Sequence, residues 1–481
     1  MGAPQYISID LGAGSGRVFL VSFEPDRIQL EEVRRFHYPP RLVGDRLCWD
    51  FGSIFENITA GISQARRRSV ELGSDPVSIG VDSWAVDYGL LDENGTLISD
   101  PTCYRDRRTE GVPEKVFEQI SRSEIFERTG IQFLDFNTIY QLFSDRGRLP
   151  DSGTMLMLPD LVNYRLCGAK AAEFTNASTT QMLNVRTRSW DVEILSRLGL
   201  NASLLPEIVE AGSVRGALPD GGPRVVSVAS HDTASAVAAA PLTRSSAYIS
   251  SGTWSLVGVE LTQQLVNERV AAANFTNEGG AFGTVRFLKN VMGMWLLERC
   301  REEWKAEGVE TGYEELIEAA FELDSASVIF PDDPRFVNPP TMLGAIRTQL
   351  AETGQEEVSQ PAAVAKTIFD SLALRYASVL RTAGELSGID LTRIEILGGG
   401  GRNGYLNQMT ANATGLPVRA GLYEATVVGN ALVQAIANGQ FADLADGRKY
   451  IEAVSELTEF VPVAVDQKMV DHYAEIEKRY I

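Results

Sequence analysis

The chain has 481 residues, more than one ordinary hydrophobic core holds, so its length indicates two domains. Its 44 Lys and Arg residues against 64 Asp and Glu residues give a net charge of −20, which argues against nucleic acid and anionic membranes as partners. The four cysteines are far apart and form no CxxC pair, and no segment reads as a secretion signal or a membrane span, so we expect a reduced, cytoplasmic protein.

Strand-like and helix-like segments alternate along the chain, a pattern typical of α/β proteins. Pro361 suits the first turn of a helix, and Gly429 suggests the start of another. The predicted strands are 6–12, 77–91, 225–229, 247–260 and 394–399. The predicted helices are 290–305, 361–386, 430–440 and 467–479.

The first predicted strand ends in a polar, glycine-rich hairpin, "IDLGAGSGRV" (9–18). Glycines let a backbone turn tightly and bring its N–H groups close to a ligand, and the side chains of Ser15 and Arg17 would add donors. These features outline a phosphate-binding loop. No Walker A lysine follows, however, and an ordinary hairpin turn would carry the same glycines.

Asp10 at the end of this strand predicts a metal ion. A carboxylate about 4 Å from one phosphate charge is repelled by roughly 4 kcal/mol at an effective dielectric near 20, so an acid beside a phosphate loop needs a cation between them. Mg²⁺ suits this position because it binds few carboxylates together with nucleotide phosphates. We therefore expect Asp10 to bind the magnesium of a metal–nucleotide complex.

The segment 81–109 has the composition of a polar sugar pocket. Trp84 would stack on an apolar sugar face, and Asp82 shares its side of the strand because alternate residues point the same way. The other candidate partners for sugar hydroxyls are Asp87, Arg105 and Asp106. A strand with a satisfied salt-bridge cluster would have the same composition.

Asp232 lies where a short apolar strand meets an alanine-rich helix, in "VVSVASHDTASAVAAA" (225–240). An Asp at such a junction often caps the helix. Active sites of α/β proteins also cluster at the carboxyl ends of strands, where the helix N-terminus would keep this carboxylate ionised. Asp232 would then accept a proton from a hydroxyl that attacks a γ-phosphate, and His231 would hydrogen-bond the same substrate.

A second hairpin, "YISSGTWSLVGVE" (248–260), repeats the pattern of "YISIDLGAGSGRVFLVSFE" (6–24). Two such hairpins half a chain apart predict two related domains with a boundary near 240–246, although short hairpins also match by coincidence. The hydroxyls of the second hairpin would hold further phosphates. In "ILGGGGRNGYLNQM" (396–409), the flat glycine run would lie against a ring, with Asn403 bonded to it, unless it is only a mobile loop.

Together, these motifs resemble the FGGY family of carbohydrate kinases, among the actin-like and hexokinase-like ATPases. The matching segments follow the family order over nearly the whole chain. They include "IDLGAGSGRV" (9–18), "VDSWAVDYGLLD" (81–92), "TNASTTQMLNV" (175–185), "SHDTASAV" (230–237), "SSGTWSL" (250–256), "TNEGGAFG" (276–283), "LKNVMGMWLLER" (288–299) and "GGGGRNGYLNQM" (398–409).

The resemblance implies an α/β fold of two actin-like (ribonuclease H-like) domains, 1–241 and 242–481, with a nucleotide and sugar cleft between them. It implies ATP and Mg²⁺ as cofactors, a small sugar as substrate, and a monomer or homodimer. Asp232 matches the general base and Asp10 the metal-associated acid. The positions that match substrate-binding residues are Ala85, His231, Asp232, Thr233 and Asn290. Those that match nucleotide-binding residues are Ala13, Gly14, Ser15, Gly16, Arg17, Thr253, Glu298, Gly399 and Asn403.

Within the family, the motifs resemble most closely the branch that phosphorylates L-rhamnulose at its primary hydroxyl. Ala85 stands where that branch has Gly, and Glu298 where it has Gln, and both departures concern the choice of sugar more than the reaction. "GGGGRN" also resembles the L-fuculose branch. The alternatives are therefore a kinase of L-fuculose, L-ribulose or another ketose, and, ranked lower, an actin-like ATPase that acts as a binding or filament module.

Overall fold

The structure is a computed structural model that describes residues 3–73, 75–324 and 326–480. Backbone contacts divide the chain into two compact units. Unit 1 comprises residues 1–241, 260–287 and 424–455, and unit 2 comprises 242–259, 288–423 and 456–481. The first change of unit falls after Pro241, next to the predicted domain boundary. Two later segments then return to unit 1.

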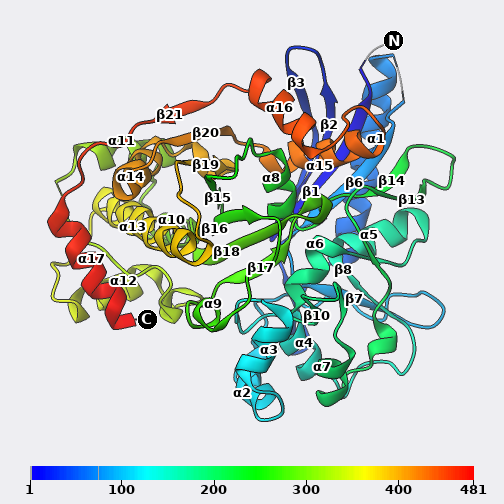
Figure 1. The fold of residues 1–481 in the computed structure, drawn as a ribbon, viewed down its shortest axis with the longest axis horizontal. Coiled ribbons are helices and arrows are strands. Elements are labelled where there is room, and N and C mark those ends of the chain that lie inside the picture. Colours follow the sequence, from blue (N-terminus) through cyan, green and yellow to red (C-terminus); the bar gives the residue numbers. More distant parts are fainter. Residues whose placement is uncertain (1–2, 74, 325, 481) are drawn as a thin grey trace. The chain divides into compact units, whose positions relative to one another are not determined.

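Unit 1 is built on a six-stranded mixed sheet with the order β13-β14-β6-β1-β2-β3 (Figure 1). The central strand β1 runs parallel to β6 and antiparallel to β2, with which it forms the first hairpin. The strands are β1 (Gln5–Gly12), β2 (Ser15–Phe23), β3 (Ile28–His37), β6 (Ser78–Ser83), β13 (Ser213–Ala217) and β14 (Arg224–Ser227). Shorter paired strands are β4 (Arg41–Val43), β5 (Arg46–Cys48), β7 (Tyr88–Leu91), β8 (Thr154–Met157), β9 (Ala172–Glu173), β10 (Leu183–Asn184), β11 (Ser189–Trp190) and β12 (Ile208–Val209).

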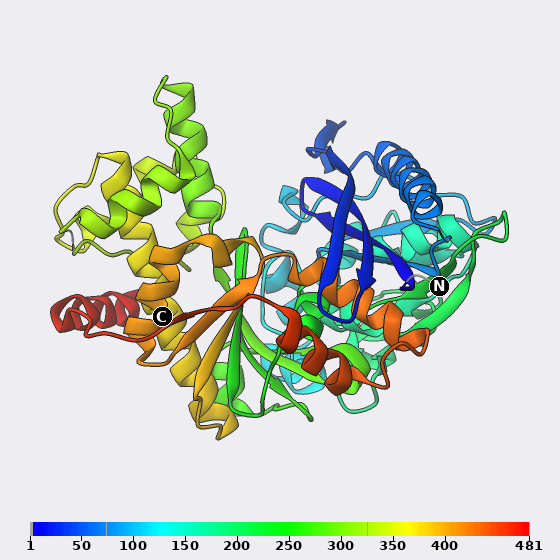
Figure 2. The ribbon, with the colours of Figure 1, turned by 90° about the horizontal axis from the view of Figure 1, so that it is seen from above.

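Helices from distant parts of the sequence cover this sheet. Helix α1 packs on β2, whereas α15 comes from near the C-terminus and contacts β1, β6 and α8; Figure 2 shows this orange helix beside the dark blue strands. The helices of unit 1 are α1 (Phe51–Glu71), α2 (Val112–Phe117), α3 (Arg122–Thr129), α4 (Thr138–Asp145), α5 (Leu158–Cys167), α6 (Phe174–Ala177), α7 (Val192–Arg197), α8 (Asp232–Ala239), α9 (Glu268–Ala272), α15 (Ala425–Ala437) and α16 (Leu444–Val454).

The second sheet has seven strands in the order β17-β18-β16-β15-β19-β20-β21. Its strands are β15 (Ser246–Ser251), β16 (Trp254–Leu261), β17 (Thr276–Gly279), β18 (Val285–Met292), β19 (Arg393–Leu397), β20 (Val418–Leu422) and β21 (Thr458–Phe460). The helices of unit 2 are α10 (Trp295–Ala306), α11 (Tyr313–Glu322), α12 (Met342–Glu352), α13 (Pro361–Ser387), α14 (Gly404–Thr414) and α17 (Gln467–Tyr480).

The two sheets share one plan, as the repeated hairpin sequence suggested. In each, the hairpin (β1/β2 or β15/β16) is antiparallel, and its first strand pairs in parallel with a strand from much later in the chain, β6 or β19. A second parallel strand, β14 or β20, and an antiparallel edge strand follow in the same order. The predicted α/β class with two related halves is thereby confirmed.

Three predicted elements have different bounds. The strand predicted at 77–91 is two strands, β6 and β7, separated by a sharp turn at Val86, whose φ is +70°. The helix predicted from residue 290 begins at Trp295, because β18 runs to Met292. The helix predicted to start after Gly429 already begins at Ala425; a Cβ at Gly429 would collide with the Ser235 carbonyl, so this glycine permits α15 to pack closely on α8.

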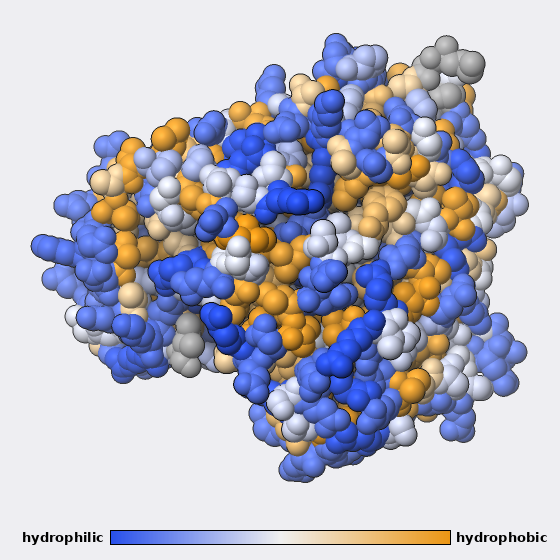
Figure 3. Space-filling view, viewed as in Figure 1, coloured by the Kyte–Doolittle hydropathy of each residue, from blue (hydrophilic) through white to orange (hydrophobic). Residues whose placement is uncertain are grey.

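The surface is mixed in polarity. On the face seen in Figure 3, hydrophilic residues surround smaller areas of apolar ones. Across the described residues, no helix combines the length and the apolar character that a bilayer crossing requires.

Candidate active site

The glycine-rich hairpin of unit 1 is held by Tyr38. The Tyr38 hydroxyl donates to the carbonyls of Gly12 (2.6 Å) and Ser15 (3.0 Å), and its backbone N–H donates to Gly14 (3.0 Å). Gly14 has a φ of +142°, which a residue with a side chain rarely adopts. The carbonyl oxygens, which would repel an anion, are thus bonded within the protein.

Arg17 has two carboxylate partners within unit 1. Its guanidinium lies 2.5 Å from Asp10 Oδ2 and 2.5 Å from Glu424 Oε2. The sequence predicted a phosphate contact for this side chain. In this structure its charge is paired with two carboxylates, and a phosphate would share the guanidinium with them.

Asp10 stands opposite Asp82 in the parallel pairing of β1 and β6. Burial and then the Asp10 charge raise the pKa of Asp82 well above its ordinary value, against an opposing hydrogen bond from Asn430 Nδ2 to Asp82 Oδ2 (2.5 Å). Asp82 Oδ1 accepts no hydrogen bond from the described residues. A divalent cation would relieve this repulsion.

These residues fit Mg²⁺ in the way that it commonly binds, through one or two carboxylates, water and phosphate oxygens. The described residues contain no group of three or more His, Cys, Asp or Glu side chains that would hold a metal unaided. Asp10, with Asp82 beside it, would therefore supply the protein ligands, and a nucleotide would have to supply the rest.

Ala85 lies in a strained turn. The N–H of Asp87 donates to the Ala85 carbonyl at 3.0 Å, and the residue between them, Val86, has a positive φ that β-branched side chains rarely adopt. Thr138 Oγ1 and Gln141 Nε2 donate to the Val86 carbonyl at 2.8 and 3.3 Å and hold the turn from α4. Strained turns of this kind recur at ligand sites.

The carboxylates proposed for sugar hydroxyls have protein partners instead. Asp87 accepts hydrogen bonds from the indoles of Trp49 (2.7 Å) and Trp84 (2.9 Å). Asp106 accepts from the Leu47 N–H (2.7 Å) and caps a 3₁₀ turn. Because the carboxylate oxygens of both acids accept hydrogen bonds from other residues of unit 1, Asp87 and Asp106 hold neighbouring side chains and backbone in place.

Asp232 is the first residue of α8, where the ends of three parallel strands meet. The Ser83 N–H at the end of β6 donates to the Ser230 carbonyl (2.9 Å), and Ser83 forms a parallel bridge to His231. The N-cap of α8 is His231, with no side-chain cap bond, so Asp232 does not act as the cap. Its side chain is 32% exposed and accepts the Thr233 N–H.

The pKa of Asp232 is raised above its ordinary value. Burial raises it most, the His231 ring lowers it, and the negative charge of Asp10 raises it further. The sequence predicted that the helix N-terminus keeps this carboxylate ionised; the Thr233 N–H does lower its pKa, but burial outweighs that effect. A raised pKa makes the carboxylate a stronger proton acceptor.

Glu173 supports this turn from within the core. The fully buried Oε2 atom accepts hydrogen bonds from Ser230 N (2.9 Å), Ser230 Oγ (2.8 Å) and Thr175 Oγ1 (2.5 Å). Thr175 Oγ1 in turn accepts the His231 N–H at 3.2 Å. One buried carboxylate thus positions the backbone that leads to Asp232.

The nucleotide-matching residues of unit 2 gather around the second hairpin. The carbonyls of Gly252 and Thr253 accept the N–H groups of Met294 (2.9 Å) and Gly293 (3.2 Å). A Cβ on Gly400 would collide with Ser251, so the glycine run packs directly on this hairpin. The structure therefore brings Thr253 and the loop of Gly399 together within the unit.

Asn403 and Glu298 lie in the same region. Asn403 is fully buried and caps α14 by accepting the Leu406 N–H (2.9 Å), whereas its Nδ2 finds no hydrogen-bond acceptor among the described residues. Glu298 is half exposed in the first turn of α10 and pairs with Arg301 at 3.1 Å. The charge that replaces the expected Gln is therefore balanced by a neighbouring arginine. Asn290 lies in β18 of the same unit.

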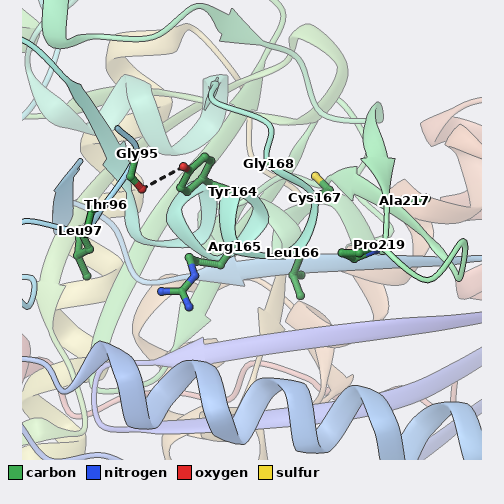
Figure 4. Close-up of a pocket in the computed structure, with 10 residues that line it drawn as sticks. All are labelled: Gly95, Thr96, Leu97, Tyr164, Arg165, Leu166, Cys167, Gly168, Ala217 and Pro219. Carbon is green, nitrogen blue, oxygen red and sulfur yellow. Dashed lines mark hydrogen bonds between the residues drawn. The ribbon is translucent and has the colours of Figure 1, made fainter. Parts of the chain in front are cut away.

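One surface hollow of about 680 Å³ lies outside this arrangement (Figure 4). Its wall includes Tyr164, whose hydroxyl donates to the Gly95 carbonyl at 3.0 Å, and Cys167 at the end of α5. None of the predicted site residues is part of its lining.

Sequence reasoning missed several residues that support the site. They are Tyr38, Glu173 and Asn430, together with Arg286 and Glu278, which lie 2.9 and 3.4 Å from Nδ1 of His231. Glu278 lies inside a family segment, "TNEGGAFG", and Glu173 lies two residues before another, "TNASTTQMLNV". The position of these two acids in or beside a motif was the signal that could have identified them. Tyr38 and Asn430 carried no local signal, because they reach the site only through the packing of distant elements.

Comparison with known proteins gives a consistent result. The model of the N-terminal domain of the FGGY family of carbohydrate kinases matches residues 5–231, and that of its C-terminal domain matches residues 247–438. A rhamnulokinase from Bacteroides thetaiotaomicron is 42% identical over 472 residues, covering 95% of this chain and 96% of that protein. A rhamnulokinase from Oceanobacillus iheyensis is 39% identical over 471 residues, covering 96% and 99%.

Solved structures of lower sequence identity share the fold. A ligand-bound xylulose kinase from Lactobacillus acidophilus superposes with a TM-score of 0.78 at 15% identity, covering 99% of this chain and 97% of that one. A Plasmodium falciparum glycerol kinase with ADP superposes with a TM-score of 0.81 at 14% identity, covering 100% and 98%.

Proposed function

Because the chain belongs to the FGGY family of carbohydrate kinases, we propose that it transfers the γ-phosphoryl group of ATP to the primary hydroxyl of L-rhamnulose. The family predicted from the motifs is confirmed by both family models. The choice of sugar is supported by relatives named rhamnulokinase, which are about 40% identical over nearly their full length.

The observation that carries the proposal is Asp232, a partly buried carboxylate with a raised pKa at the N-terminus of α8. It would take the proton of the primary hydroxyl as that oxygen attacks the γ-phosphorus. His231, Thr233, Ala85 and Asn290 would bind the sugar, as the motifs predict.

The nucleotide would be bound by the residues that match the family motifs. The phosphates would contact the 13–17 hairpin and Thr253, and the nucleoside would contact Gly399 and Asn403, with Glu298 nearby. Asp10, with Asp82 beside it, would bind Mg²⁺, which when bound neutralises the developing phosphate charge.

The proposed setting is the cytoplasm, with the protein a monomer or homodimer. The support for this setting comes from the sequence, whose four cysteines form no CxxC pair.

An assay of ADP release across purified ketoses tests the proposal. We expect the highest kcat/KM with L-rhamnulose, and sugar-dependent release that is strongly reduced in Asp232→Asn. A higher value with L-fuculose or L-ribulose would assign the enzyme to that sugar instead. ADP release at the same rate with and without each sugar would favour the actin-like ATPase.

A further inference from the structure

The His231 ring has charged neighbours on both nitrogens. Nδ1 lies 2.9 Å from Arg286 Nη2 and 3.4 Å from Glu278 Oε2. Nε2 lies 3.4 Å from Asp232 Oδ1. All four residues belong to unit 1, and three of them are buried. The protonation of this ring therefore decides what it offers to Asp232 and to a bound sugar.

Arg286 is fully buried beside Glu278 and His231. Its side chain has no solvent exposure, its Nε donates to the Gly279 carbonyl at 2.9 Å, and its Nη1 lies 3.1 Å from Glu278 Oε2. Both partners come from β17, whereas Arg286 itself lies near the start of β18. The remaining Nη2 group is directed at His231.

An arginine side chain only donates hydrogen bonds, so Nδ1 of His231 must accept here. An imidazole that accepts at Nδ1 carries its single proton on Nε2. The alternative, a proton on Nδ1 shared with Glu278, would place that hydrogen against the N–H of Arg286. Glu278 is also the more distant neighbour and already pairs with Arg286.

We propose that Arg286, oriented by Glu278, is a positioning residue that fixes the Nε2–H tautomer of His231. The ring then presents an N–H donor to Asp232 in the free enzyme and to a substrate hydroxyl in the complex. The second part rests on the proposed function, whereas the tautomer itself requires no substrate.

The tautomer is measurable by ¹⁵N NMR of histidine-labelled protein, because the chain has only three histidines. His231→Gln assigns the signal. We expect a protonated Nε2 and a bare Nδ1 in the native protein, and a mixture of tautomers in Arg286→Met. A protonated Nδ1 in the native protein, or an unchanged spectrum in Arg286→Met, would overturn the proposal whatever sugar the enzyme uses.

Kinetics then separate positioning from a purely structural role. Losing one well-oriented hydrogen bond to the sugar should raise its KM about tenfold in Arg286→Met, with the KM for ATP unchanged. In a His231→Gln background the same substitution should add less than about twofold, because both act through one ring. If the two substitutions multiplied each other's effects on the KM for the sugar, or if the KM for ATP rose equally, Arg286 would not act through His231.

Glu278→Gln is the second variant, because it keeps the shape of the side chain should Arg286→Met fail to fold. We expect a partial gain of the Nδ1–H tautomer, since the neutral amide holds Arg286 less firmly. Full retention of the native tautomer in a folded Glu278→Gln protein would remove Glu278 from the proposal.

Discussion

Asp10 and Asp82 stand opposite each other on neighbouring parallel strands, Asp10 in β1 just before the glycine-rich turn and Asp82 near the end of β6. Because these two carboxylates repel each other, removing one of them should raise the stability of the metal-free protein and weaken the stabilisation by Mg²⁺. Asp82→Asn should stabilise the metal-free protein by about 1–2 kcal/mol, because it removes a buried like charge. It should also reduce the thermal shift caused by Mg²⁺ with ADP. Melting curves with and without Mg²⁺ measure both effects, and a larger metal-dependent shift would contradict the assignment.

Asp232→Asn should lower kcat by about 10²–10⁴-fold, because an amide cannot accept the substrate proton. Sugar binding measured by calorimetry should remain, since the variant keeps its size. Asp220→Asn is the matched control at an exposed aspartate and should keep native turnover. Native-like kcat in Asp232→Asn would remove the general base from the proposal.

The raised pKa of Asp232 also predicts a pH profile. The working form is the carboxylate, so kcat/KM should fall as the pH drops through this pKa, at a higher pH than an ordinary aspartate near 3.9 would give. Rates between about pH 3.5 and 8, corrected for unfolding, check this. An acidic limb at or below the ordinary value would contradict the burial argument.

Glu173 should matter through its acceptor atom more than through its charge. Glu173→Gln keeps a carbonyl oxygen for the donors of Ser230 and Thr175, so it should retain most activity. Glu173→Leu leaves those buried donors without an acceptor. It should therefore lower the free energy of unfolding by about 2–4 kcal/mol and lower kcat strongly. Unfolding curves and initial rates compare the pair. Equal losses in both variants would show that the charge itself is required.

Asp160 predicts a pH-dependent stability. Burial and then the neighbouring Glu173 raise its pKa well above the ordinary value. The native state is therefore favoured while Asp160 is protonated, and this stability is lost as the pH rises from near 4 through the folded pKa. Asp160→Asn should thus match the native protein at low pH and exceed it by about 1–2 kcal/mol at pH 8.

Asp220→Asn is the control for that series, because its pKa is lowered by Arg66 and the sign reverses. This substitution should offer no gain at pH 8. Denaturant unfolding at several pH values measures the stability of both variants. A stability gain of Asp160→Asn over the native protein that shrinks with rising pH would contradict the predicted direction.

Ala85→Gly tests the departure at the sugar site. Removing one methyl group should change the KM for L-rhamnulose by about fourfold. The KM should fall if the methyl group of Ala85 narrows the sugar pocket. Stability should fall by about 0.5–1 kcal/mol, because glycine adds backbone freedom beside the strained Val86 turn. An unchanged KM for every ketose would place the Ala85 side chain away from the sugar.

The sequence alone determined the family, the α/β class, the two hairpins, and the positions of Asp10 and Asp232. These follow from short contiguous motifs, in which the chemistry and the backbone turn that presents it lie within a few residues. The site's support was decided only by tertiary structure. Asp82, Glu173, Arg286 and Asn430 meet their partners through strand register and helix packing across tens to hundreds of positions, and no local pattern encodes those distances. The same long-range packing gave Gly429 its role, since only the approach of α15 to α8 makes a side chain there impossible.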